Sequence, residues 1–196
     1  MVCFKFFHKA VFKARGIPKK FIYSRLRKLY WQAQGAKFGK DTFLPHLKIT
    51  WPHQLQIGDN CLLEEDIFFK FDGPWKPGPS IIICDRVFIG SGCEFNISKG
   101  ISIGIDCLIA SGCKFIDHDH GMSSLDQPMN QQQGSESLIT LERDVWLGAN
   151  VIILKGVYIG KSSVVGAGSV VTKSIPENEI WSGVPAKKLR TRERHL

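Results

Sequence analysis

Aliphatic residues recur at every sixth position through residues 139–173. These positions are Leu141, Leu147, Ile153, Ile159, Val165 and Val171. The fourth residue after each of the first five is small or β-branched, as the series Val145, Val151, Val157, Ser163 and Ser169 shows. A period of six fits neither an amphipathic helix, which repeats every ~3.6 residues, nor an alternating hairpin. It is typical of a parallel β-solenoid in which three six-residue sides form one coil and the aliphatic residue points inward.

The same rhythm occurs earlier in the chain. Its inward positions there are Ile57, Leu63 and Phe69, then Ile83, Ile89 and Phe95, then Ile103, Ile109 and Phe115. Between the last two runs the register slips by two residues at Lys99–Gly100, which predicts an insertion at a corner of the coil. The glycines that follow inward residues, Gly148, Gly160 and Gly166, are expected at corners where a positive φ is needed.

Two segments interrupt the repeat. Residues 72–80 contain three prolines and two glycines, a composition that predicts a loop. Residues 116–138 are polar and far longer than a corner requires, so they predict an extended loop that leaves the coil. Long polar excursions from a rigid scaffold are common places for function.

Positive charge is concentrated at the start of the chain. The formal net charge is +8, yet residues 1–40 hold 11 Lys or Arg residues and no acid, and the remainder is slightly acidic. Residues 1–16 mix Phe with Lys without an uninterrupted apolar core, so we expect neither a signal peptide nor a membrane span there.

A helix is predicted between Pro18 and Gly35. Its apolar face comprises Ile22, Leu26, Leu29, Tyr30 and Ala33. Two interpretations of this arm remain open: a helical cap on the open end of the solenoid, or a basic arm that rests peripherally on an anionic membrane. We expect no nucleic-acid partner, because no recognition module is visible.

Four of the six cysteines take the small inward position of the repeat: Cys61, Cys93, Cys107 and Cys113. Their spacing contains no CxxC pair and does not indicate a disulfide framework. We therefore expect buried small hydrophobic residues rather than a metal or redox site.

The stretch from Val145 to Arg190, VWLGANVIILKGVYIGKSSVVGAGSVVTKSIPENEIWSGVPAKKLR, resembles the hexapeptide-repeat acyltransferases. The likeness is to the maltose, galactoside and nodulation acetyltransferases and to the O-acetyltransferases of polysaccharide biosynthesis. It implies an all-β fold, a left-handed parallel β-helix with an N-terminal helical arm and an extended loop near 116–138. The handedness comes from the resemblance alone. Expected boundaries are a basic arm at 1–40, the β-helix at 41–175 and a basic tail at 176–196.

The resemblance also implies an activity and an assembly. Members of the family transfer an acetyl group from acetyl-CoA to a hydroxyl without a resident metal, and they are homotrimers with active sites between neighbours. Outward-facing Trp146, Ile152, Tyr158 and Val164 are consistent with subunit packing. The expected acceptor is a sugar or glycan of a surface polysaccharide. The expected location is the cytoplasm, with the inner face of the membrane as an alternative.

His118 and His120, in the sequence DHDHG, are the candidate general bases, because histidine titrates near neutrality. A loop-stabilising His–Asp pair is the alternative. The galactoside and maltose enzymes place their catalytic histidine eight residues after the corner that corresponds to Gly112, which indicates His120 rather than His118. We expect Asp117 or a main-chain carbonyl to orient its ring.

Other site residues follow from matching positions in the family. Trp146, Gly148 and Ala149 match its W-[IL]-G-[SA] element, and the Ala149 N–H is the expected donor to the thioester oxygen. Further expected acetyl-CoA contacts are Ala167, Lys173, Lys187 and Arg190, of which the last three suit phosphates. On the acceptor side we expect Asn96, Ser98 and Asp117.

Three alternative functions remain open. One is a xenobiotic acetyltransferase of the chloramphenicol or streptogramin type, and another is a non-catalytic trimeric scaffold. The third is a zinc enzyme resembling the γ-carbonic anhydrases, which share the fold. His118-x-His120 could supply two zinc ligands, but no third histidine stands in a neighbouring repeat.

Overall fold

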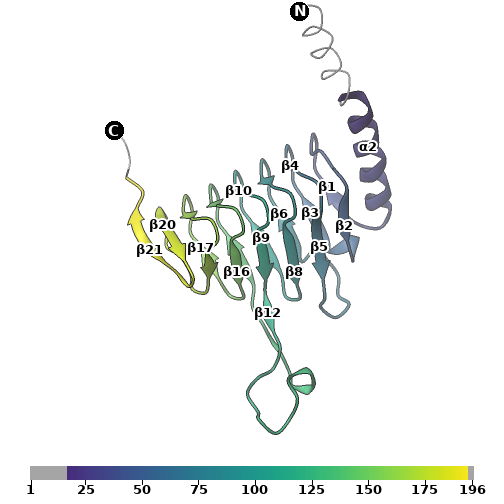
Figure 1. Ribbon diagram of the computed structural model, residues 1–196. Helices are drawn as coiled ribbons and strands as arrows, with labels where there is room; N and C mark the ends of the chain where they lie inside the picture. The colour runs from purple at the N-terminus through teal and green to yellow at the C-terminus, as the bar shows by residue number, and fades with distance from the viewer. Residues whose placement is uncertain (1–16, 194–196) are drawn as a thin grey trace, which may run out of the picture.

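Three parallel β-sheets form the sides of a long prism in the computed structural model, which describes residues 17–193 (Figure 1). The first sheet contains β1 (Lys37–Phe38), β3 (Leu55–Ile57), β6 (Ile81–Ile83), β9 (Ile101–Ile103), β14 (Ile139–Leu141) and β17 (Tyr158–Ile159). The second contains β4 (Leu62–Leu63), β7 (Phe88–Ile89), β10 (Leu108–Ile109), β15 (Trp146–Leu147), β18 (Val164–Val165), β20 (Glu179–Gly183) and β21 (Ala186–Thr191). The third contains β2 (Leu47–Ile49), β5 (Ile67–Phe71), β8 (Glu94–Ile97), β11 (Lys114–Ile116), β16 (Ile152–Leu154) and β19 (Val170–Val171).

The coil length agrees with the predicted three units of six. Ile57 pairs in parallel with Ile83, Ile83 with Ile103, and Ile103 with Leu141, so equivalent positions stack on successive coils. All of the predicted inward aliphatic and phenylalanine positions are buried. On the third sheet, the ring of Phe95 stacks between Phe69 and Phe115, with centroid distances of 4.7 and 4.6 Å. The periodic pattern therefore confirms both the fold and its inward face.

The glycine prediction was wrong for the three residues that it named, because Gly148, Gly160 and Gly166 do not have a positive φ. Positive φ does occur at Gly92, Gly112, Gly156 and Gly168. The corner between the first and second sheets instead uses mainly Asp and Asn, at Asp41, Asn60, Asp106, Asp144 and Asn178, with Arg86 and Ser162; Asp and Asn tolerate the left-handed region better than most side chains. Gly148 has a different role, because a Cβ there would lie 2.6 Å from the Ala167 nitrogen on the next coil.

The four predicted inward cysteines are buried, as expected. Each described cysteine from Cys61 to Cys113 is a free thiol. Burial raises the pKa of Cys107 to about 12, so this thiol stays protonated near neutrality and is a poor nucleophile. These side chains fill the prism as small hydrophobic groups.

The predicted extended loop projects from the side of the prism (Figure 1). It leaves and returns through a short antiparallel ribbon of β12 (His118–Asp119) and β13 (Ser135–Glu136). A 3₁₀ turn, η2 (Met129–Gln131), lies within it, and a second, η1 (Pro52–Gln54), precedes β3. The ribbon fixes the histidine-bearing end of the loop against the coil.

The basic C-terminal segment forms structure rather than a free tail over its described part. Strand β20 extends the second sheet in parallel beside β18, and β21 folds back on β20 in antiparallel pairing. This hairpin carries Lys187 and Arg190 at the last coil of the prism.

The predicted helix is present as α2 (Ile17–Ala33), beside the first coil (Figure 1). Trp31 packs against the core from this helix. Residues 1–16, for which we expect neither a signal peptide nor a membrane span, lie outside the described residues. Within residues 17–193, no helix has the length and apolar character needed to cross a bilayer.

Candidate active site

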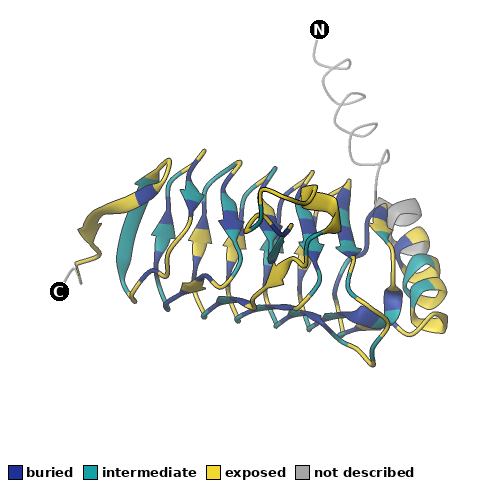
Figure 2. Cartoon of the chain, turned by 90° about the horizontal axis from the view of Figure 1, so that it is seen from below, coloured by how far each residue is buried: buried dark blue, intermediate teal, exposed yellow. Residues whose placement is uncertain are grey.

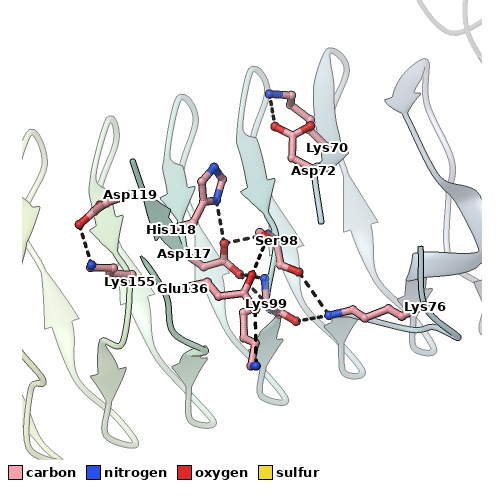
Figure 3. A network of polar contacts seen from close by, with 11 residues as sticks. Lys70, Asp72, Lys76, Ser98, Lys99, Asp117, His118, Asp119, Glu136 and Lys155 are labelled. Carbon is pink, nitrogen blue, oxygen red and sulfur yellow. Dashed lines mark hydrogen bonds and ion pairs between the residues drawn. The ribbon is translucent and has the colours of Figure 1, made fainter. Parts of the chain in front are cut away.

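A buried carboxylate lies where the extended loop leaves the coil. Asp117 is fully buried, and its Oδ1 accepts a hydrogen bond from the Ser98 N–H at 2.8 Å. Its Oδ2 accepts from the N–H groups of Lys99 at 2.8 Å and Gly100 at 2.7 Å (Figure 3). These three donors belong to the corner insertion that the register slip predicts. The insertion thus forms a backbone cradle for one carboxylate on the next coil.

Asp117 also contacts a histidine. Its Oδ1 lies 3.0 Å from Nδ1 of His118 (Figure 3). Because this oxygen belongs to a carboxylate that already receives backbone N–H groups, Nδ1 must carry the proton and donate it. The neutral ring then has its unprotonated nitrogen at Nε2, which suits a general base. The His118 side chain is 24% exposed, so it is held by the protein and remains accessible.

His120 is placed differently. It is exposed, and it forms no hydrogen bond or ion pair within residues 17–193. Asp119 between the two histidines forms an ion pair with Lys155, whose Nζ lies 2.7 Å from Oδ2 (Figure 3). Asp117, one of the two expected partners of the His120 ring, instead contacts His118. The geometry therefore favours His118 over His120 as the base.

A cavity of about 390 Å³ adjoins this pair. It is lined by Pro74, Ser98, His118, Asp119, Gln133, Gly134, Ser135 and Glu136. The Ser98 hydroxyl donates to Glu136 Oε2 at 2.6 Å, and Lys99 Nζ lies 3.5 Å from Oε1. The Ser98 hydrogen bond and Lys99 lower the pKa of Glu136 below its ordinary value, so this carboxylate is ionised at neutral pH.

Asn96 lies on β8, one coil before the loop, and its main-chain carbonyl accepts the Asp117 N–H at 3.4 Å. Its side-chain Oδ1 is buried and lacks a hydrogen-bond partner among the described residues. An orphaned buried acceptor is costly unless something donates to it. Asn96, which we expect to contact the sugar, thus lies next to Asp117, and its side-chain oxygen receives no hydrogen bond from the described residues.

The expected acetyl-CoA residues occupy a different part of the surface. Trp146, half-exposed on β15, and Arg190, exposed on β21, line a cavity of about 460 Å³. Leu108, Asp144, Val164, Ile180, Arg192 and Glu193 complete its lining. Gly148 and Ala167 meet on successive coils, and the Ala149 N–H donates to no acceptor among the described residues.

Lys173 and Lys187 are exposed, and neither forms an ion pair in the described part of the chain. Lys188 is different, because its Nζ lies 2.5 Å from Glu179 Oε1. Three cations, at Lys173, Lys187 and Arg190, are therefore available to a ligand near the end of the prism.

The expected site residues fall into two groups that do not share a cavity. His118 lies beyond the third sheet, whereas Trp146 and Arg190 lie on the second sheet. Sequence reasoning missed Glu136, Lys155 and Arg192. Glu136 belongs to the extended loop and Lys155 contacts it, and the six-residue pattern does not predict which residues meet in that loop. Arg192 binds the Ser162 carbonyl at 2.7 Å through a chain reversal that the repeat does not encode.

No group of three or more His, Cys, Asp or Glu side chains within residues 17–193 is arranged to hold a metal ion.

Two family models match the repeats. The model described as "Bacterial transferase hexapeptide (six repeats)" matches residues 139–173, and "Hexapeptide repeat of succinyl-transferase" matches residues 80–113. Both matched regions lie in the prism.

Curated relatives match a longer part of the chain. WbbJ of Escherichia coli (strain K12), named as a lipopolysaccharide biosynthesis O-acetyl transferase, is 39% identical over 117 residues. The match covers 56% of this chain and 60% of that protein. The galactoside O-acetyltransferase of Lactococcus lactis is 33% identical over 138 residues, covering 66% and 59%. The chain thus spans about 60% of the length of these two relatives.

Solved structures agree with the fold. AntD, an N-acyltransferase from Bacillus cereus in complex with dTDP and 3-hydroxybutyryl-CoA, superimposes with a TM-score of 0.72 at 22% identity, covering 85% of this chain and 89% of that chain. A hexapeptide-repeat containing acetyltransferase from Vibrio cholerae, complexed with acetyl coenzyme A, gives 0.61 at 25% identity, covering 87% and 78%. The expected left-handed parallel β-helix is confirmed.

Proposed function

This chain is a homologue of the hexapeptide-repeat transferases, and from that premise we propose that it transfers an acetyl group from acetyl-CoA to a sugar hydroxyl. The observation that carries the proposal is the Asp117–His118 pair, held by the corner at residues 98–100 and open to a polar cavity. Direct transfer between two bound substrates needs one base and one oxyanion donor, and the chain offers a candidate for each.

In the proposed reaction, Nε2 of His118 takes the proton from the acceptor hydroxyl as its oxygen attacks the thioester carbonyl carbon. The Ala149 N–H donates to the oxygen on which negative charge develops. When the carbon–sulfur bond breaks, the imidazolium returns the proton to the leaving thiolate. Asp117 holds Nδ1–H throughout, so that the same ring nitrogen faces the substrate in every cycle.

The exposed cations near the end of the prism fit acetyl-CoA. Lys187 and Arg190 lie on β21 of the second sheet, and Lys173 follows β19 of the third sheet. All three suit its phosphates, since charge-assisted contacts are the strongest hydrogen bonds available at a surface. The half-exposed indole of Trp146 offers an apolar face in the same cavity as Arg190.

A sugar acceptor is supported by the polar lining of the cavity beside His118. A hydroxyl-rich ligand can hydrogen-bond to this lining, whereas an apolar drug would leave its polar groups unpaired. The names of the two relatives, which refer to lipopolysaccharide biosynthesis and to galactosides, favour a glycan unit over a xenobiotic.

Acetyl-CoA binding is the direct test. Calorimetric titration is expected to show saturable binding, with release of free thiol when a suitable sugar is added. No binding at about 1 mM acetyl-CoA would contradict the proposal, since Michaelis constants lie between about 1 μM and 1 mM. The non-catalytic scaffold predicts no thiol release with any sugar.

Arg190→Ala and Lys173→Ala are expected to raise the Michaelis constant for acetyl-CoA about tenfold or more, with a smaller effect on turnover. Phosphate contacts are equally strong in the ground and transition states, so their loss weakens binding uniformly. Steady-state kinetics with varied acetyl-CoA measure both constants. Lys188→Ala is the matched control, because Glu179 already binds that ammonium group. A collapse of turnover at an unchanged Michaelis constant would contradict this assignment.

A homotrimer is proposed for a structural reason. One outward row of side chains on the second sheet is apolar, and it consists of Leu62, Phe88, Leu108, Trp146, Val164 and Ile180. Leu62, Leu108 and Trp146 are each more than half exposed. If a neighbouring subunit covers this row, His118 of one copy would also approach Trp146 and Arg190 of another copy. Within one chain these residues do not share a cavity.

Sedimentation is therefore expected to give about three times the 22.0 kDa mass of the chain. Leu62→Arg, in the same row but outside the cavity of Trp146 and Arg190, should dissociate the assembly and abolish turnover together, because a buried unpaired charge is costly at an interface. Leu125→Arg, on the exposed tip of the loop, serves as the control. A wild-type monomer that still turns over would disprove this arrangement.

A further inference from the structure

Helix α2 contacts the prism through its polar side. Ser24 is buried, and its hydroxyl oxygen accepts the Leu44 N–H at 2.9 Å. One turn further, Arg27 donates to the Leu44 carbonyl at 3.5 Å, and Lys28 Nζ donates to the Gly39 carbonyl. These three residues, together with Trp31, hold the helix on the first coil.

The apolar side of the same helix consequently faces away from the prism. Tyr23, Leu26, Leu29 and Tyr30 are 54%, 57%, 64% and 61% exposed. Their spacing of three and four residues puts them on one side of the helix. Figure 2 shows exposed residues along the outer edge of this helix. The amphipathic helix is thus inverted relative to the cap expected on the solenoid end. No other described segment covers this surface, which we call the outer face of α2.

Helix α2 carries cations and no acid, and Arg25 is exposed on it. Lys37 and Lys40 are exposed on the coil that follows, where Asp41 is also exposed and Asp59 accepts the Lys40 N–H. Residues 1–40 contain no Asp or Glu at all. The sequence directly before the helix continues the same composition, with Phe4, Phe6, Phe7 and Phe12 among Lys and Arg residues.

We propose that the outer face of α2 lies on an anionic lipid bilayer, parallel to its surface. Exposed aliphatic and aromatic side chains would enter the boundary between headgroups and acyl chains, and the flanking cations would contact anionic headgroups. The helix would rest on the membrane, because its 17 residues include several charges and do not meet the requirements of a span.

Charge decides between this partner and a second copy of the chain. Two outer faces brought together would juxtapose two helices that carry cations and no acid, which is repulsive. A bilayer with anionic lipids supplies both the apolar phase and the opposite charge. The proposal is independent of the acetyl-transfer chemistry, so either can fail without the other.

The test is sedimentation of the full-length protein with vesicles of phosphatidylcholine containing about one quarter phosphatidylglycerol. Binding is expected to these vesicles, to be much weaker to pure phosphatidylcholine and to fall steeply with added salt. The variant Leu26→Ser/Leu29→Ser should lower the partition coefficient about tenfold or more, since binding scales with buried apolar area. Leu125→Ser, at a fully exposed leucine in the extended loop, should bind as the wild type does.

Three results would overturn the proposal. The first is an absence of vesicle binding at physiological salt, and the second is wild-type binding by the double variant. The third is a double variant that has a lower oligomeric mass or a lower melting temperature than the wild type when both are measured in the absence of vesicles. A fall in mass would mean that another copy covers the outer face, and a fall in melting temperature that the chain itself covers it. The acetyl-CoA titration above reports separately on whether the enzyme is competent.

Discussion

Replacing His118 with alanine is expected to lower turnover by about 10²–10⁴-fold at saturating acetyl-CoA and saturating acceptor, the usual cost of losing a general base. His120→Ala is expected to retain turnover near that of the wild type. The reason is geometric: Asp117 lies 3.0 Å from Nδ1 of His118, whereas His120 is exposed and has no partner among the described residues.

The comparison must separate chemistry from folding. Both variants should keep the wild-type melting temperature and affinity for acetyl-CoA, because neither ring belongs to the hydrophobic core or to the cofactor group. A dead His120→Ala beside an active His118→Ala would restore the assignment expected from the sequence. Equal losses would show that the two histidines act as a unit.

Asp117→Asn is expected to lower both turnover and stability. The amide keeps the size of the side chain but replaces one acceptor oxygen with a donor, which would face the N–H groups of Lys99 and Gly100. Losing these charge-assisted bonds should cost about 2–4 kcal/mol in the free energy of unfolding. Turnover should fall about 100-fold or more, because the His118 ring loses the group that selects its tautomer.

Denaturant unfolding and steady-state kinetics on the same preparations measure the two effects. Asp72→Asn is the matched control, since that carboxylate forms only a partly exposed ion pair with Lys70 and such pairs are worth about 1 kcal/mol or less. His118→Ala completes the set, because it should lose turnover while keeping stability. If Asp117→Asn unfolds and turns over like the wild type, the cradle at residues 98–100 has no such role.

The repeat in the sequence was sufficient to predict the prism and its interior. A residue such as Phe95 points inward because each six-residue side has the same length, so its burial follows from its place in the count. The cysteines at the equivalent small positions were predicted to be buried for the same reason. The slip at Lys99–Gly100 was also readable as an insertion, although its purpose was not.

The sequence did not predict which groups contact the Asp117 carboxylate. The carboxylate meets N–H groups that precede it by 17 to 19 residues, because the coil returns them to its side. Counting along the loop favours His120 and the contact of Asp117 favours His118, and the two alanine variants decide between them. Among the expected cofactor residues, Trp146 and Arg190 share a cavity only because the C-terminal hairpin reverses beside β18.

Helix α2 likewise has one property that the sequence predicts and one that only the tertiary structure decides. The sequence by itself determined that residues near 18–35 form an amphipathic helix, since spacing and end signals are local properties. Only the tertiary structure decided which side faces the prism. Leu44 and Gly39 present main-chain groups at that edge, and polar Ser24, Arg27 and Lys28 satisfy them better than leucine could, so the apolar side is turned outward.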